Sequence, residues 1–504
     1  MSGERSVHLV VRGGARPHGN ERRSVVRRNL IPAAVTAISL SLSACATNPA
    51  TGGSMLSLVS EGQEIEMGQQ YRLEVEREQG LYDDSALNAY VDSVGQALAA
   101  VSERPDLPWS FAVVDDPVVN AFALPGGPIY LARGIMAHFN SEAELASVLG
   151  HEIGHVTARH IVEQMSRQQI AQLGLIASMI AVPDLMPYSE GLSGALGVVF
   201  LKFGRDDEAQ SDELGFRYMT RLGYDPQGAV DMFEILDRQG EGSGRAIPEW
   251  ASTHPDPGNR IAAAEERIAK SGLRDGLVRR DEYLQRIQGL VWGEDPREGY
   301  FLGQRFLHPE LAFQFTLPDG LLKRKSKTAV LAGSPDKDAK FQLTAGSGSP
   351  ERAAEEFFSR DGIERTGIAR KSVNGLPAVV GTWSTTTRQG VIEGIASFVQ
   401  YGDLTYTMLG YAPSSRVGRY AASMERTMNS FAPLTDSTLL AVEPRRIDLV
   451  RVSEAMTAGE FVSRYPSTVE DADVFRINGI RSSDRIEAGT LLKRVTGTGG
   501  PVGR

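Results

Sequence analysis

The chain has 504 residues, enough for about three domains of ordinary size. Hydrophobic residues make up 41% and charged residues 23% of it, which excludes an intrinsically disordered chain, a collagen and a disulfide scaffold. The 53 Lys and Arg residues against 63 Asp and Glu residues leave a net charge of −10, so we expect no nucleic-acid partner. A single cysteine, Cys45, excludes an intramolecular disulfide.

Residues 1–44 have the pattern of a secretory signal peptide. The basic stretch RRSVVRR precedes an apolar run at 30–44 that is too short to span a membrane. The run leads into LSAC, which resembles the lipobox of bacterial lipoproteins and implies lipid modification of Cys45. Because Ala46 follows, the resemblance also implies anchoring at the periplasmic face of a Gram-negative outer membrane. We expect residues 45–58, which are mostly small and polar, to form a flexible lipid-anchored tether.

Residues 59–300 are predicted to form one mainly helical domain with a short hairpin. Apolar residues recur at helical spacing within 59–104, and the stretch 111–115 has the pattern of a strand. Two short strands are predicted within 118–133, on either side of the turn sequence PGG. The predicted fold class is therefore α+β.

The next predicted helix begins at Ser141 and extends to about Arg167. Glu144 stands three residues after Ser141, which is the spacing of a capping box. Apolar residues at three-to-four spacing follow it, as in a helix with one face toward a core.

This helix carries the sequence HEIGH at 151–155, the strongest chemical signal in the chain. His151 and His155 are four residues apart and share one helical face, so their imidazoles can bind one metal ion. Glu152 is turned about 100° from His151, so it can act on a water molecule as a general base. The pattern predicts one Zn²⁺ ion per chain.

A catalytic zinc ion usually has three protein ligands and one open position. The extended motif with a third histidine is excluded, because Ala158 and Ile161 stand where Gly and His are needed. His160 lies about 180° round the predicted helix from His151, so we expect it to form a structural hydrogen bond.

A second helix, predicted from about 206 to 222, offers carboxylates instead. Glu208 and Asp212 are four residues apart, so Glu208 could bind zinc while Asp212 accepts a hydrogen bond from a ligand histidine. Spacing alone leaves Asp207 and Glu213 as alternatives to Glu208.

Several segments in order over about 60–290 resemble the gluzincin metalloprotease family of the CAAX prenyl endopeptidase, HtpX, BepA and LoiP. They are NAFALPGG, HEIGHVTARH, R-x-x-E-x-x-x-D, GYDP and THPDPxxR. The resemblance implies a zincin-type fold in its soluble periplasmic lipoprotein branch, with zinc held by His151, His155 and Glu208. It also implies that Asp212 supports a ligand histidine.

The same resemblance implies one further part of the catalytic site, and the predicted hairpin suggests another. His254, in the T-H-P sequence, belongs to a loop that can approach the zinc ion, which suggests a latent state. The hairpin strand would pair with the backbone of an extended substrate. Its predicted substrate-binding residues are Asn120, Ala121, Phe122, Ala123 and Leu124.

Two modules are predicted after the protease domain. Residues 301–437 resemble the PsbP-like α/β fold, and residues 445–496 resemble a small βααβ LysM domain. LysM domains bind N-acetylglucosamine-containing glycans, so peptidoglycan is a possible partner, although the usual GDTL start is here Gly459-Glu460-Phe461.

The predicted function is that of a periplasmic zinc metalloendopeptidase acting on unfolded or misassembled envelope and outer-membrane proteins. One alternative is a binding or assembly factor whose peptidase is latent and which the C-terminal modules tether to the cell wall. A second alternative is a zinc hydrolase acting on a non-peptide bond, which the edge strand disfavours.

Overall fold

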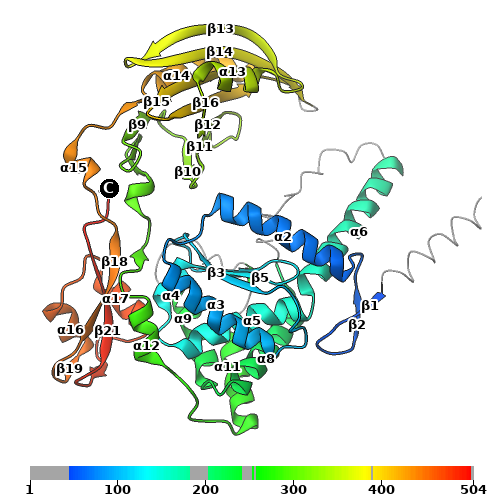
Figure 1. Cartoon of the computed structure of the whole chain (residues 1–504), viewed down its shortest axis with the longest axis vertical. Helices are drawn as coiled ribbons and strands as arrows, with labels where there is room; N and C mark the ends of the chain where they lie inside the picture. The colour runs from blue at the N-terminus through cyan, green and yellow to red at the C-terminus, as the bar shows by residue number, and fades with distance from the viewer. Residues whose placement is uncertain (1–44, 182–201, 241–252, 255–256, 388–389, 501–504) are drawn as a thin grey trace, which may run out of the picture.

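The computed structural model describes residues 45–181, 202–240, 253–254, 257–387 and 390–500. The predicted signal segment, 1–44, lies outside the described residues. Helices and strands occur side by side in the described part, so the α+β class is confirmed. A helical body lies at one end of the molecule, a large sheet at the other, and the C-terminal strands lie beside the helical body (Figure 1). Among the described helices, none combines the length and the apolar character that a membrane crossing requires.

The first described segment differs from the predicted flexible tether. Strands β1 (Cys45–Thr47) and β2 (Ser54–Leu56) pair antiparallel. The amide of Asn48 donates a hydrogen bond to the side-chain oxygen of Gln210, and the backbone N–H of Leu58 donates one to Ser166. These two hydrogen bonds attach the segment to the helical body.

A three-stranded sheet lies at the start of the helical body. The elements are α2 (Glu61–Glu78), α3 (Ser85–Ala100), β3 (Ser110–Val114), β4 (Ala121–Ala123) and β5 (Pro128–Ala132). The strand order is β3-β5-β4, with β3 parallel and β4 antiparallel to β5. The predicted hairpin is therefore confirmed, and β4 is an edge strand. Helix α2 contacts the hairpin turn at Gly68, where a methyl group would lie 1.9 Å from the carbonyl oxygen of Pro125.

The helix predicted from Ser141 to Arg167 is two helices. Helix α4 (Arg133–His138) precedes them, α5 (Glu142–Thr157) ends at the metal motif, and α6 (His160–Ala181) follows. Arg159 separates α5 from α6 with a left-handed backbone, φ 61°. This conformation is uncommon for a residue with a side chain. The buried Arg159 guanidinium stabilises it by donating to the carboxylate of Glu64 and to the carbonyl of Val59.

Helix α5 packs directly on the backbone of a second helix. The remaining helices of the body are α8 (Arg205–Arg221), α9 (Gln227–Gly240), α11 (Pro257–Ser271) and α12 (Arg280–Arg286). Gly150 and Gly154 of α5 face Gly215 and Ser211 of α8, and methyl groups at either of the first two would lie 3.0 Å from a backbone Cα atom. The small residues therefore let α8 approach the metal motif closely.

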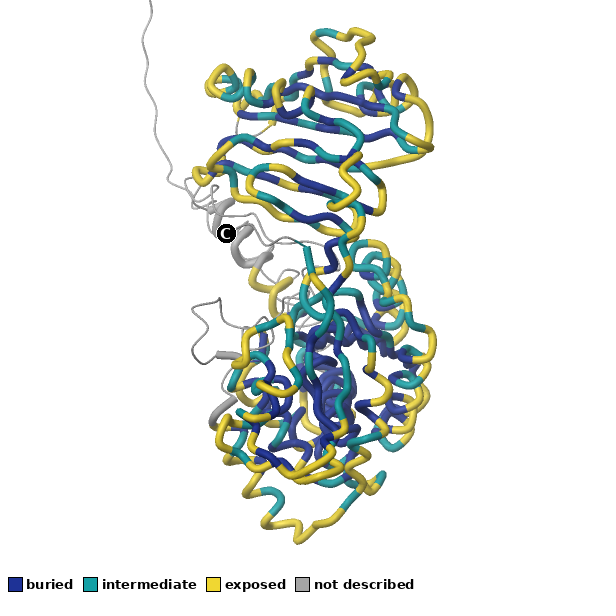
Figure 2. The backbone as a smooth tube through the Cα atoms, turned by 90° about the vertical axis from the view of Figure 1, so that its left-hand side faces the viewer, coloured by how far each residue is buried: buried dark blue, intermediate teal, exposed yellow. Residues whose placement is uncertain are grey.

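Residues 300–433 contain two antiparallel sheets. The smaller has the order β17-β9-β8-β7 and the larger the order β10-β11-β12-β16-β15-β14-β13. In the larger sheet, buried and exposed residues alternate along several strands (Figure 2). The elements are η2 (Pro296–Glu298), β7 (Tyr300–Leu302), β8 (Arg305–His308), β9 (Phe313–Thr316), β10 (Leu322–Lys325), β11 (Ala329–Gly333), β12 (Lys340–Ser347), α13 (Pro350–Phe358), β13 (Glu364–Val373), β14 (Leu376–Thr387), β15 (Gly390–Tyr401), β16 (Leu404–Pro413), α14 (Ser414–Asn429) and β17 (Ala432–Pro433).

The C-terminal strands share a sheet with the helical body. Strand β18 pairs on one side with β21 and on the other with β6 (Val291–Trp292), which lies before residue 300. The elements are α15 (Ser437–Leu440), β18 (Arg445–Arg451), β19 (Met456–Thr457), α16 (Ala458–Arg464), α17 (Asp471–Asn478), β20 (Arg485–Ile486) and β21 (Leu491–Thr496). The predicted helical unit and the predicted C-terminal unit are thus joined through backbone hydrogen bonds.

The contact between α5 and α8 can be tested with Gly215→Ala. The new methyl group would lie 2.8 Å from the backbone nitrogen of His151, so one helix must move. We expect a loss of about 1–3 kcal/mol in the free energy of unfolding, measured in urea, because overpacking strains the interface. Gly62→Ala is the control, since its methyl group meets nothing within 4 Å. Equal stability of Gly215→Ala and the wild type would contradict the close contact.

Candidate metal centre

Four potential metal ligands from three segments meet in the helical body. They are His151, His155, Glu208 and His254, and one donor atom of each lies within 4.8 Å of the others. The Nε2 atoms of His151 and His155 are 3.0 Å apart. All four residues are at most 2% exposed.

Glu208 and His254, which both follow the two histidines of α5 in the sequence, complete the group. The carboxylate of Glu208 lies 3.5 Å from Nε2 of both His151 and His155. Nδ1 of His254 is 2.9 Å from the same carboxylate and 3.3 Å from Nε2 of His151. The structure thus places Glu208 next to His151, His155 and His254. Asp207 instead accepts a hydrogen bond from the backbone of Gly204.

Glu152 lies beside the four donors without joining them. Its Oε1 atom is buried and has no hydrogen-bond partner among the described residues; Nε2 of His254 is 3.7 Å away. Burial raises the pKa of the Glu152 carboxyl. A buried carboxylate with an unused oxygen and a raised pKa is suited to receiving a proton.

Arg260 links the two carboxylates of α8. Its guanidinium donates to Asp212, with Nε 2.9 Å from Oδ2, and lies 2.9 Å from Oε2 of Glu208. Burial by itself raises the pKa of Asp212, but Arg260 and His151 outweigh it and hold the pKa below the usual range. Asp212 therefore stays ionised, and its Oδ1 accepts the Nδ1 proton of His151 at 2.9 Å.

His155 is oriented by a separate chain of hydrogen bonds. Its Nδ1 atom is 3.0 Å from Nδ1 of His160, and Nε2 of His160 is 2.7 Å from the side-chain oxygen of Gln210. Asn48 donates to that same oxygen. Because the amide oxygen of Gln210 only accepts, Nε2 of His160 carries the proton and donates to it. The other ring nitrogen of a neutral His160, Nδ1, is then an acceptor, so Nδ1 of His155 donates to it.

His160 therefore forms the structural hydrogen bond that the sequence predicted, although the geometry differs. It belongs to α6 and not to the helix of His151, because the chain turns at Arg159. Gln210 and Arg260 also belong to the site, although no sequence pattern had predicted a role for them. Arg260 ends the THPDPxxR motif and was detectable there, whereas Gln210 lies in a polar run with no distinguishing pattern.

The donor chemistry fits a zinc ion. Both ligand histidines donate through Nδ1, so their Nε2 atoms present lone pairs to each other at 3.0 Å and to the carboxylate of Glu208. Facing lone pairs and a buried carboxylate repel one another unless a cation lies between them. Two imidazoles and a carboxylate are the ligands of one common type of catalytic zinc site.

The predicted substrate strand lies next to the metal helix. Residues 121–123 form β4, which contacts α5, and Asn120 and Leu124 flank it. All five residues are buried, and the side-chain oxygen of Asn120 has no partner among the described residues. Cys45, the predicted lipidation site, is the first residue of β1 and lies three residues before Asn48.

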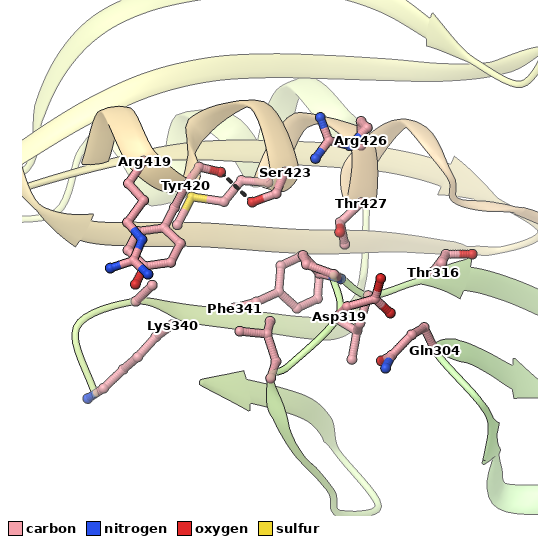
Figure 3. A pocket seen from close by; sticks show the side chains of 15 residues that line it. Gln304, Thr316, Asp319, Lys340, Phe341, Arg419, Tyr420, Ser423, Arg426 and Thr427 are labelled. Carbon is pink, nitrogen blue, oxygen red and sulfur yellow. Dashed lines mark hydrogen bonds between the residues drawn. The ribbon is translucent and has the colours of Figure 1, made fainter. Parts of the chain in front are cut away.

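A separate cavity of about 560 Å³ lies in the region with the large sheet (Figure 3). Phe341 and Met424 line it from β12 and α14, and Arg419, Lys340 and Asp319 contribute charged groups. No histidine or cysteine occurs among its lining residues, so it does not repeat the metal chemistry of the helical body.

Arg260→Gln tests whether this residue supports the metal centre. Loss of the guanidinium leaves two buried carboxylates without their cation, so we expect zinc affinity to fall by roughly 10–100-fold. Affinity would be measured by competition with a chelator. Arg267→Gln is the matched control, because Arg267 lies on the same helix over the ring of Phe216. Equal zinc affinity of Arg260→Gln and Arg267→Gln would contradict the supporting role.

Known proteins resemble parts of this chain. The Beta-barrel assembly-enhancing protease of Escherichia coli (strain K12) is 31% identical over 281 residues, which cover 53% of this chain and 57% of that protein. The Mitochondrial metalloendopeptidase OMA1 of Arabidopsis thaliana is 35% identical over 182 residues, 36% of each chain. The chain therefore spans little more than half the length of the first relative.

A solved structure of cyanobacterial PsbP from Synechocystis sp. PCC 6803 is 13% identical, with a TM-score of 0.23, and covers 26% of this chain and 91% of that chain. The family model described as Peptidase family M48 matches residues 85–268. This span contains all four metal donors and Glu152. Residues 85–268 of this chain are therefore similar in sequence to Peptidase family M48, over a span that contains the candidate metal centre.

Proposed function

We propose that the chain is a zinc-dependent endopeptidase of the bacterial cell envelope that cleaves unfolded or misassembled proteins. The observation that carries the proposal is the buried group of His151, His155 and Glu208 with the carboxylate of Glu152 beside it. The name of the Escherichia coli relative, a protease that enhances β-barrel assembly, supports outer-membrane proteins as substrates.

His151, His155 and Glu208 would hold the zinc ion, which when bound supplies Lewis-acid polarisation of the scissile carbonyl and of a water molecule. Glu152 accepts the proton of the attacking water at its unpaired Oε1 atom and returns it to the leaving amine. Asp212 holds His151 through Nδ1, and His160 holds His155 in the same way.

Strand β4 supplies the means to bind an extended chain. It is the edge strand of its sheet and lies against α5, which carries the metal ligands. A substrate backbone that pairs with residues 120–124 would pass close to Glu152. Backbone pairing tolerates many side-chain sequences, which suits a protease for unfolded substrates.

His254 holds the site in a latent form. Its Nδ1 atom faces Glu208 and its Nε2 atom faces Glu152, so the imidazole occupies the space between the ligands and the base. With His254 as a fourth donor, a bound zinc ion would have no open position for a water molecule, and catalytic zinc needs one. Cleavage therefore requires His254 to move away.

The rest of the chain would anchor the peptidase and supply accessory modules. A lipid on Cys45 would anchor the protein to the outer membrane on the periplasmic side, with the PsbP-like region at 301–437 and the LysM-like region at 445–496 as accessory modules. The LysM-like region would contact peptidoglycan in this arrangement. The alternative function, an assembly factor that binds its clients without cutting them, is favoured by the presence of His254 among the donors.

Glu152→Gln tests the base directly. We expect cleavage of an unfolded protein to fall by at least about 100-fold, because the amide cannot accept a proton. Bound zinc should stay at one ion per chain, because Glu152 is not among the four donors. Metal content would be measured beside the cleavage assay on residues 45–504. Full cleavage by Glu152→Gln would contradict the mechanism.

His254→Ala tests latency and separates the two candidate functions. Removal of the imidazole opens one coordination position, so we expect the cleavage rate to rise, about tenfold or more, over the wild type. The double variant with Glu152→Gln is the control and should be inactive. Bound zinc with no cleavage in either the wild type or His254→Ala would favour the assembly factor over the peptidase.

A further inference from the structure

The C-terminal residues 445–496 have two separate hydrophobic contacts. One set of side chains forms a small core within the unit: Val452, Met456, Ala458, Phe461, Val462, Val474, Ile486 and Leu492. A second set belongs to the main core of the helical body: Ile447, Ile477, Leu491 and Val495. Because Leu491 and Leu492 are neighbours on β21, the strand divides its side chains between the two cores.

The backbone joins the unit to the helical body as well. Arg445 and Arg446 of β18 pair with Trp292 and Val291 of β6. The backbone N–H of Gly289 donates to the carbonyl of Ile447 at 2.8 Å. A module that moved freely on a linker would not form these hydrogen bonds.

The side chain of Lys493 extends from this unit into the helical body. It is fully buried, and its Nζ atom lies 2.9 Å from the carbonyl oxygen of Ala137 and 2.7 Å from that of Phe139. These carbonyls are at the C-terminal end of α4, where the last turn of a helix leaves its acceptors unpaired. A cation is also favoured at this end by the helix dipole.

The same carbonyls stand immediately before the metal-binding helix. Ser141 is the N-cap of α5 and accepts from the backbone N–H of Glu144. The carboxylate of Glu144 accepts from the N–H of Asn140 at 2.6 Å, one residue earlier than in a regular capping box. Lys493 and Glu144 therefore fix the two sides of the short turn between α4 and α5.

Lys493 is itself held in place on both sides. Its backbone N–H donates to the side-chain oxygen of Asn478, and the amide of Asn478 donates to its carbonyl. Arg280 of α12 donates to the carbonyls of Asn140 and Leu491, which lie on opposite sides of the interface.

A fully buried lysine side chain needs hydrogen-bond acceptors, and Nζ of Lys493 has them in the carbonyls of Ala137 and Phe139. Burial lowers the pKa of Lys493, and the carboxylate of Glu144 opposes that effect. A group with such a cost is kept where it holds a particular conformation, and here that conformation is the start of α5.

From these contacts we propose that residues 445–496 are a permanent support of the metal-binding helix, with Lys493 as its positioning residue. The unit fixes the N-terminus of α5, so that His151 and His155, roughly two and a half and three and a half turns further along, meet Glu208 in register. The inference rests on the proposed function only in that α5 carries the metal ligands. Residues 445–496 would thus support the helical body, whether or not they also contact glycan.

Lys493→Met tests the positioning role in the full chain. The thioether fills the space but leaves the carbonyls of Ala137 and Phe139 without a donor. We expect amide hydrogen exchange in the first turn of α5, residues 142–146, to become roughly tenfold faster. Zinc affinity, measured by chelator competition, should fall several-fold. Neither measurement depends on cleavage, so failure of the proposed peptidase activity would not alter the result.

Two further variants separate positioning from general destabilisation. Lys493→Gln keeps a donor and should recover part of the protection of α5. Arg494→Met, on the same strand but facing Asp448 at the surface, should leave both measurements unchanged. Unchanged exchange in Lys493→Met, or equal effects of Lys493→Met and Arg494→Met, would overturn the proposal.

A cleavable linker covers the case in which Lys493→Met fails to fold. A specific protease site inserted before Glu443, which is exposed, would allow the folded chain to be cut there. We expect the C-terminal fragment to stay bound in gel filtration and the zinc to stay in place. Separation of the fragment from a body that keeps its zinc affinity would overturn the proposal.

Discussion

The metal centre depends on the close contact between the backbones of α5 and α8. Gly150 and Gly154 bracket HEI in α5, and Ser211 and Gly215 bracket DEL in α8, so neither helix has a bulky side chain where they cross. This contact brings the carboxylate of Glu208 to within 3.5 Å of Nε2 of both histidines. Larger residues at these four positions would separate the helices and move the third ligand out of reach, whatever the ligand residues were.

That approach buries several charges, and the rest of the site compensates for them. Glu208 and Asp212 would be unstable as a buried pair of carboxylates, and Arg260 neutralises them from α11. The two histidines are held from outside, one by Asp212 and the other by His160. Each histidine thus has its own hydrogen-bond partner, which fixes the orientation of its ring.

Segments near both ends of the described residues contribute to the same helical body. Near the N-terminus, Asn48 joins the hydrogen bonds that lead through Gln210 to His155. Near the C-terminus, Lys493 reaches the turn that starts α5. The large antiparallel sheet differs from these segments, because its core is formed by its own residues. Residues 300–433 therefore resemble an appended module with a core of its own. Residues 445–496 do not, because several of their side chains belong to the core of the helical body.

The sequence by itself determined the chemistry of the site. The spacing of His151, Glu152 and His155 on a helix, the β4 hairpin around PGG and the acidic helix with Glu208 were all predictable, because each rests on local periodicity or turn-forming residues. The choice of Glu208 over Asp207 and Glu213, the turn at Arg159, the role of Arg260 and the attachment of the C-terminal unit were decided by tertiary structure. Their common physical reason is that each depends on contacts between residues far apart in the chain, which no local pattern specifies.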